Sequence, residues 1–167
     1  MSGEITKVKR SELAHFLKTG ESTFDRIRKA TSGTVNMNPQ TTTEQYIDED
    51  SATTSVEGYQ PSMEAPMTAY AGDPIFEYLL PLYNAHAIGA SVESEYIEVH
   101  KFKSTTSNGA TSYEAKKNKC AISISSFGGD AGAPVSLTFT ININGDPTAG
   151  TATIDAATGQ ATFTAAS

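Results

Sequence analysis

Residues 134–144 read PVSLTFTININ, and this stretch decides the fold. Apolar side chains occupy every second position, and Ser, Thr or Asn fills the positions between them. A period of two gives a segment one apolar and one polar face, which is typical of a half-buried strand in an antiparallel sheet. The predicted buried face consists of Val135, Leu137, Phe139, Ile141 and Ile143.

The same alternation continues on both sides of this strand. Cys120, Ile122 and Ile124 repeat it, and the glycine-rich residues 128–132 predict a turn between the two segments. Further turns are expected at residues 144–147, which read NGDP, and at Thr158-Gly159. Residues 91–165 are therefore predicted to form a β-rich core, with strands at 91–103, 112–127, 134–144, 150–155 and 160–165.

A helix is predicted over residues 73–89. Asp73 is placed as the N-cap and Pro74 as the first helical residue, where its missing N–H costs nothing. Apolar residues then recur at helical spacing, so one face of the helix should pack on a sheet. Pro81 removes a backbone hydrogen bond, and we expect a kink or break near Leu80, with Gly89 ending the element.

The first 38 residues carry weaker signals. Residues 1–22 are predicted to be an N-terminal arm with a short helix from Ser11 to Leu17, stopped by Gly20. The arm is either solvated or docked on a neighbouring subunit. Residues 23–38 are expected to form a strand with a turn near Ser32-Gly33.

Residues 41–70 are predicted to be a long hairpin, rich in Thr and Ser and turning around residues 48–52. Its apolar residues do not share one parity, so both faces are polar and neither face fits a core. Such a hairpin is either a flexible surface feature or part of a sheet that other copies complete. The candidate contact or lumen residues are Glu44, Asp48, Asp50, Glu57 and Tyr59.

The 167 residues are enough for one self-sufficient domain, and we expect residues 1–167 to form it. The predicted fold is mainly β, a β-sandwich or barrel with one flanking α-helix and a long projecting hairpin. A net charge of −7 argues against a surface that holds phosphate backbones, although it suits a surface that DNA passes without adhering.

The sequence displays no convincing catalytic or metal-binding constellation, so we expect no enzyme activity, metal or cofactor. His15, His86 and His100 are isolated in sequence, which disfavours a zinc site. Residues 48–50 lack the ligand spacing of a calcium loop, and Cys120 lies in an alternating strand where a buried, unreactive thiol is expected. The early residues do not resemble a signal peptide, and no apolar run reaches the length of a membrane span, so synthesis in a cytoplasm is expected.

Three motifs and the C-terminal pattern together resemble the major tail tube proteins of long-tailed, siphovirus-type bacteriophages, over roughly residues 10–164. The matching motifs consist of residues that mark turns and the start of a helix, and none of them is a catalytic or ligand-binding motif. They are Tyr46-Ile47-Asp48-Glu49, then Val56-x-Gly58-Tyr59-x-Pro61-Ser62, then Tyr70-x-Gly72-Asp73-Pro74-Ile75-Phe76 with its helix, and finally Gly150-Thr151-Ala152-Thr153-Ile154 with the Gly159 turn and Ala161-Thr162-Phe163.

This resemblance implies a β-sandwich flanked by a helix, a fold that is similar to the tube protein of type VI secretion. Copies would form hexameric rings that stack into a hollow tail tube, with four strands per subunit lining the lumen. The implied partners are other copies of the chain, the tape-measure protein, and the tail terminator and distal tail proteins. Viral DNA would pass through the lumen without specific binding, and the protein would reside in the virion tail after assembly in the host cytoplasm.

Two features depart from the family pattern: the chain has no appended immunoglobulin-like module and no tryptophan. A monomeric β-sandwich that binds carbohydrate or acts as an adhesin is the alternative function. It requires an exposed aromatic platform, for which Tyr46, Tyr59, Tyr70 and Tyr113 are available. A small hydrolase would require convergent titratable groups that the sequence does not display.

Overall fold

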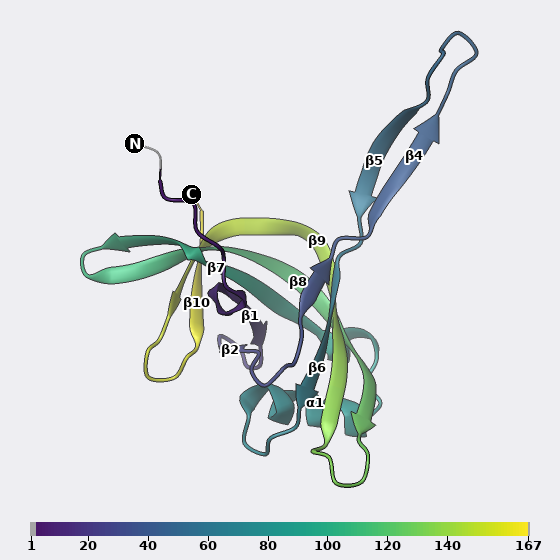
Figure 1. Cartoon of the computed structure of the whole chain (residues 1–167). Helices are drawn as coiled ribbons and strands as arrows, with labels where there is room; N and C mark the ends of the chain where they lie inside the picture. Colours follow the sequence, from purple (N-terminus) through teal and green to yellow (C-terminus); the bar gives the residue numbers. More distant parts are fainter. Residues whose placement is uncertain (1–2, 167) are drawn as a thin grey trace.

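The computed structural model describes residues 3–166, and an eight-stranded antiparallel sheet organises them (Figure 1). The strand order is β10-β2-β1-β7-β8-β9-β6-β3, and β10 also pairs with β9. The strands from β10 round to β9 therefore close into a barrel, and β6 and β3 extend the sheet beyond it. The predicted mainly β fold with a flanking α-helix is confirmed.

The strands are β1 (Leu13–Lys18), β2 (Phe24–Arg26), β3 (Thr34–Asn36), β4 (Pro39–Glu44), β5 (Thr53–Tyr59), β6 (Ser62–Thr68), β7 (Glu93–Ser107), β8 (Ala110–Gly128), β9 (Ser136–Ile154) and β10 (Ala161–Ala165). The α-helix is α1 (Pro74–Asn84), and the 3-10 turns are η1 (Arg10–Glu12) and η2 (Gly89–Val92).

The alternating strand predicted from residues 134–144 forms the first half of β9. Leu137, Phe139 and Ile141 are fully buried, and each contributes about 1.5–3 kcal/mol by leaving water. Val135 was expected on the same face, but it precedes the strand and is 45% exposed. The alternation thus holds over the paired residues and stops where pairing with β6 and β8 stops.

The turn predicted at residues 144–147 is wrong, because β9 continues through it to Ile154. Lys117 and Lys119 of β8 pair with Thr148 and Asn144, so three residues of β9 bulge opposite Asn118 alone. Gly145 takes a positive φ of 71° there, and its carbonyl accepts a hydrogen bond from the Asn118 amide at 3.3 Å. The turn residues bend the strand without reversing it.

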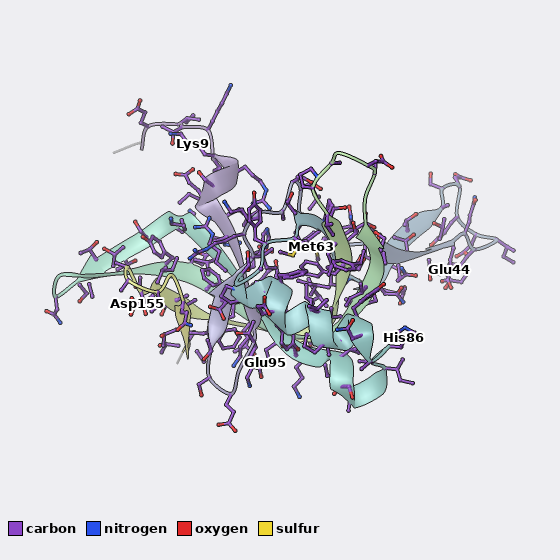
Figure 2. The ribbon with its side chains drawn as sticks, turned by 90° about the horizontal axis from the view of Figure 1, so that it is seen from below. Lys9, Glu44, Met63, His86, Glu95 and Asp155 are labelled. Carbon is purple, nitrogen blue, oxygen red and sulfur yellow. The ribbon has the colours of Figure 1, made fainter. Side chains whose placement is uncertain are left out.

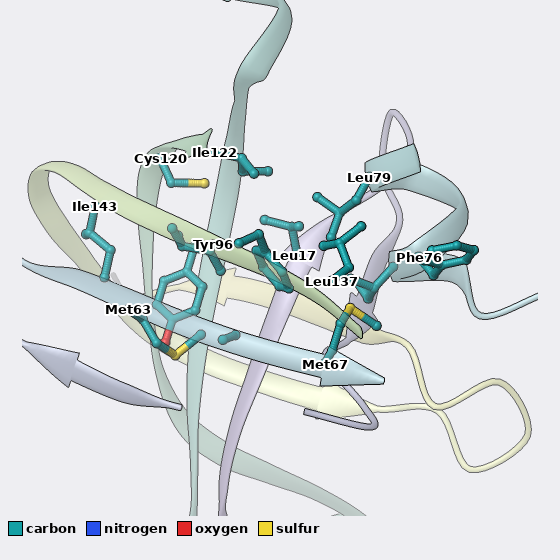
Figure 3. Packing of buried hydrophobic residues seen from close by; sticks show 14 residues of the cluster. Leu17, Met63, Met67, Phe76, Leu79, Tyr96, Cys120, Ile122, Leu137 and Ile143 are labelled. Carbon is teal, nitrogen blue, oxygen red and sulfur yellow. The ribbon is translucent and has the colours of Figure 1, made fainter. Parts of the chain in front are cut away.

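Two apolar clusters make up the core. The first lies between the β6, β8 and β9 surface and α1, whose Phe76 and Leu79 face Leu137 and Met67 (Figure 3). The second fills the barrel between β1, β2, β7, β10 and the other halves of β8 and β9. Strands β8 and β9, each 19 residues long, contribute side chains to both clusters.

The short helix predicted from Ser11 to Leu17 is wrong, since residues 13–18 form β1 between β2 and β7. Phe16 points into the second cluster and Leu17 into the first, so both faces of the strand are buried. A strand buried on both faces has a continuous apolar run in place of an alternation. Residues 13–18 are therefore a central strand, and the predicted N-terminal arm is restricted to the residues before η1.

Helix α1 begins as predicted and ends earlier. The Asp73 carboxylate accepts a hydrogen bond from the Ile75 N–H at 2.9 Å, and Pro74 is the first helical residue. Glu77 caps the entry from the other side by accepting the Gly72 N–H at 2.9 Å. The helix runs through Pro81 without a break and ends at Asn84, so the predicted end at Gly89 is wrong.

Candidate assembly surface

A two-stranded arm, residues 39–59, projects from the edge of the sheet (Figure 1). Its strands, β4 and β5, pair only with each other, and every arm residue except Gly58 is exposed. The arm continues the ribbon formed by β3 and β6, and β3 is itself an edge strand of the main sheet. Both long sides of the arm therefore present unpaired backbone N–H and C=O groups.

The base of the arm is a kinked joint at Asn38, which takes a positive φ of 45°. The Asn38 side-chain amide donates to the carbonyls of Gln60 at 3.0 Å and Asn36 at 3.3 Å. The Gln60 N–H in turn donates to the Met37 carbonyl at 3.1 Å. Asparagine tolerates this left-handed backbone better than most residues, so the joint fixes the direction in which the arm leaves the sheet.

Polar contacts link side chains within the arm. The hydroxyls of Thr43 and Thr54 are 2.8 Å apart across the strands, and Tyr46 donates to the Glu44 carboxylate at 2.8 Å. A bulge between Gln40 and Thr41 leaves Glu57 without a cross-strand partner. Apolar side chains remain uncovered along the arm: Tyr46 at 59%, Ile47 at 109%, Val56 at 56% and Tyr59 at 56% exposure.

The structure brings the predicted contact residues together on this single arm. Glu44 ends β4, Asp48 and Asp50 lie in the connecting loop, and Glu57 and Tyr59 belong to β5. The predicted hairpin of residues 41–70 was too long, because residues 62–68 form β6 inside the main sheet. Asp73 and Pro74 lie apart from the arm and act on α1 alone.

A second hairpin, at the tip of β7 and β8, was missed. Ser107 pairs with Ala110 across a two-residue loop, and Asn108 and Gly109 both have positive φ angles, of 53° and 78°. Asn-Gly between strand-like residues is the strongest short signal for such a turn, and the sequence carries it. Residues 102–111 of this hairpin are exposed.

A pocket of about 210 Å³ lies between β1 and β6, which are not neighbours in the sheet. We call it the arginine pocket because Arg10 and Arg26 line it, together with His15, Ser32 and Gly33. Arg10 donates to the Leu13 carbonyl at 2.6 Å and to the Gly33 carbonyl at 2.8 Å. Arg26 donates to the Ser11 carbonyl at 3.2 Å.

His15 is one of the residues that line the arginine pocket, and it is 6% exposed. Burial and, to a smaller extent, the nearby charge of Arg10 together lower the pKa of His15 to about 4. The Nε2 atom lies 2.9 Å from the Arg10 guanidinium, which can only donate, so Nε2 accepts and the ring is neutral. Nδ1 is then left to donate to the Tyr96 hydroxyl.

The remaining titratable groups do not assemble into a reactive site. Burial raises the pKa of the Cys120 thiol to about 12, so this side chain stays protonated. Within residues 3–166, no three His, Cys, Asp or Glu side chains are placed to hold a metal ion. No helix in that range is both long and apolar enough to span a bilayer.

No protein-family model matches the sequence, and no curated protein matches it. Solved structures do. A chain in the tail of an empty gene transfer agent (GTA) particle, refined with helical and C6 symmetry, aligns with a TM-score of 0.63 at 13% identity, covering 86% of this chain and 98% of that one.

A chain in the virion of a native gene transfer agent particle aligns with a TM-score of 0.57 at 11% identity, with the same coverage of 86% and 98%. Identities this low establish the fold alone. The chain therefore has the fold of a protein found in the tail of a gene transfer agent particle.

Proposed function

We propose that this protein is the structural subunit of a phage-like tail tube, of the siphovirus type. Copies form hexameric rings, and the rings stack into a hollow tube that encloses the tape-measure protein and conducts DNA. The observation that carries the proposal is the fold shared along 86% of this chain with a chain from a particle tail that was refined with C6 symmetry. The proposal includes no catalytic activity and no cofactor.

The arm supports self-assembly independently of that likeness. An exposed ribbon with two free backbone edges and uncovered Ile47 and Val56 is an association liability for a monomer. A subunit that builds a larger sheet with its neighbours satisfies those edges, because each strand then has a partner on both sides. The arm is thus the first surface that we assign to contacts between copies.

Charge fits a tube that conducts DNA. The net charge of −7 gives the subunit a field that repels phosphate backbones, so DNA slides past it without being held. Assembly in the host cytoplasm, residence in the virion tail, and capping by tail terminator and distal tail proteins complete the proposed role.

Negative-stain electron microscopy of the purified chain over a concentration series tests this function. We expect rings or tubes with six-fold symmetry above a threshold concentration, and a variant without the arm provides the control. A chain that stays monomeric at every concentration contradicts the proposal, and glycan binding by that monomer would point to a β-sandwich binding module instead.

A further inference from the structure

The net negative charge of the chain is concentrated on the arm. Residues 39–59 contain acidic side chains and neither Lys nor Arg, although the chain has 12 Lys and Arg elsewhere. The loop between β4 and β5 places Asp48, Glu49 and Asp50 at the tip, beside the fully exposed Ile47. Within residues 3–166, none of these carboxylates forms an ion pair.

The arginine pocket has the opposite imbalance. The ion pairs among residues 3–166 involve Lys and His only, so Arg10, Arg26 and Arg28 have no carboxylate within 4.0 Å in that range. Arg10 and Arg26 donate to backbone carbonyls, and Arg10 also donates to the neutral His15 ring, and none of these acceptors carries a compensating unit charge. Burial lowers the pKa of Arg26, and the charges of Arg28 and Arg10 lower it further, so Arg26 lies near enough to both of these groups to be repelled by them.

Neither of two buried carboxylates relieves this repulsion. Asp25, next to Arg26 in sequence, accepts hydrogen bonds from Thr19 and Gln160 instead. Glu98 is 8% exposed and lies close enough to influence His15, but His100 binds it at 2.7 Å and Lys116 lies 4.0 Å from it. The pocket therefore has excess positive charge and a volume of about 210 Å³. Its guanidinium groups are donors suited to a carboxylate.

The arm of the same chain does not reach this pocket. Gly33 lies at the pocket and the ribbon then leads away from it through β3 to the arm. Figure 2 shows the arm residue Glu44 at the far side of the molecule from Lys9, the neighbour of Arg10. A carboxylate that fills the pocket must come from another molecule.

We infer that the arginine pocket of one copy receives the carboxylates of residues 48–50 from the arm of a second copy. The inference rests on the proposed self-assembly and names the contact. Each copy has one arm and one pocket at different places, so the contact is heterologous and propagates from copy to copy, as a growing tube requires. A nucleic acid is the poorer occupant, because its phosphates meet the field of a chain with a net charge of −7.

Charge neutralisation at the tip provides the first test. The triple variant Asp48→Asn, Glu49→Gln, Asp50→Asn should raise the concentration needed for assembly by roughly tenfold or more, because it leaves the guanidinium groups at the contact without a carboxylate partner. The matched control is Thr105→Lys, Thr106→Lys, Thr111→Lys, which adds the same charge to exposed positions on the β7–β8 tip. That control should assemble at nearly the wild-type concentration.

Cysteine crosslinking provides the second test without altering the arginines. In a chain carrying Glu49→Cys and Ser32→Cys, oxidation of the assembled protein should give a ladder of covalent multimers on non-reducing gels. Cys120 is 1% exposed and stays out of the reaction. The control pair is Glu49→Cys with Thr106→Cys, which should give no ladder.

The outcomes separate this contact from the function on which it rests. Tubes that form without the Ser32 crosslink, or a neutralised tip that assembles like the wild type, overturn the contact and leave the tail tube function standing. A wild-type chain that never assembles overturns the proposed function itself. Binding of a DNA oligonucleotide to the pocket, lost on changing Arg26→Gln, would assign the pocket to nucleic acid and also overturn the contact.

Discussion

At the scale of single residues, His15 shows how a polar group is tolerated in this core. The ring is buried, yet each nitrogen has a partner, Arg10 on one side and Tyr96 on the other. Neutrality is the condition for this arrangement, because a protonated ring has no lone pair for the guanidinium. His15 is therefore a group whose protonation opposes folding.

The stability of the protein should fall as the pH drops through the range between the two pKa values of His15. The folded pKa is about 4 and the ordinary value is 6.5, so the unfolded chain binds more protons between them. The loss should be complete near pH 4 and amount to at most about 3 kcal/mol. Urea unfolding of wild type and His15→Gln near pH 7 and near pH 4.5 measures it, and the variant should lose less stability on acidification.

His100 acts in the opposite direction and must be separated from His15. Burial lowers the pKa of His100, but hydrogen bonds to Glu98 and Glu114 outweigh it and the pKa is raised. This group stabilises the fold below its ordinary pKa and loses that effect as the pH rises through the folded value. Equal acid sensitivity in wild type and His15→Gln would contradict the role assigned to His15.

Gly150 should be intolerant of a side chain. A Cβ at this position would lie 2.2 Å from the Thr164 carbonyl oxygen and 2.7 Å from the Phe163 ring, because β10 packs closely on β9. Gly150→Ala should destabilise the protein by about 1–3 kcal/mol and lower its Tm by several degrees. Gly58→Ala is the matched control, since nothing lies within 4 Å of its Cβ position and its Tm should be almost unchanged.

Local chemistry made some residues predictable from sequence. The Asp73 cap was correct because its hydrogen bond joins residues two positions apart and depends on nothing distant. The faces of the arm acids were not predictable, because alternation reports a face only where one face is buried. Glu44 and Glu57 lie in strands with no buried residue, so the sequence pattern does not show which way their side chains point.

At the scale of elements, the arm is the part of the fold that contributes least to the stability of one molecule. Its strands bury almost nothing, and the ribbon is held by its own ladder and by the Asn38 joint. An element of this kind opens and closes nearly independently of the core. In the proposed assembly, other copies of the chain supply the contacts that the arm lacks in a single molecule.

Removal of the arm should separate folding from assembly. Replacing residues 38–60 by Asn-Gly should leave the Tm of the monomer within about 2 °C of wild type, since no core contact is lost. The same variant should form no tubes under the electron microscope. A large drop in Tm would show that the arm supports the core, contrary to its exposure.

Strands were predictable from the sequence where one face is buried and the other is exposed to solvent. The first half of β9 met that condition and was found from its alternation, whereas β1 did not. The sequence of β1, LAHFLK, has apolar residues on both faces, and a short continuous apolar run does not distinguish a central strand from a helix. The bulge at Gly145 was also hidden, because it involves the register with β8 and a hydrogen bond from Asn118, a residue distant in sequence.

At the scale of the whole molecule, the segregation of charge should make assembly sensitive to salt. The acidic arm and the arginine pocket attract through charges that salt screens, with a Debye length of about 3 Å at 1 M and about 30 Å at 0.01 M. Raising NaCl across that range should lower the assembled fraction measured by sedimentation. An assembled fraction that increases with salt would indicate that apolar contacts dominate the interface.

Strands β8 and β9 run through both apolar clusters, so the two halves of the molecule, one around each cluster, share the two longest strands. Unfolding of one cluster would release half of β8 and half of β9, and the strands that hold the other cluster would then lose part of their packing. Neither half of the molecule should therefore unfold alone. The cooperative unit of unfolding is then the entire body of the subunit. Scanning calorimetry of the monomer should show one transition whose calorimetric and van't Hoff enthalpies agree. In a tube wall built from such subunits, a subunit under load would not unfold in part; it would stay folded or unfold completely.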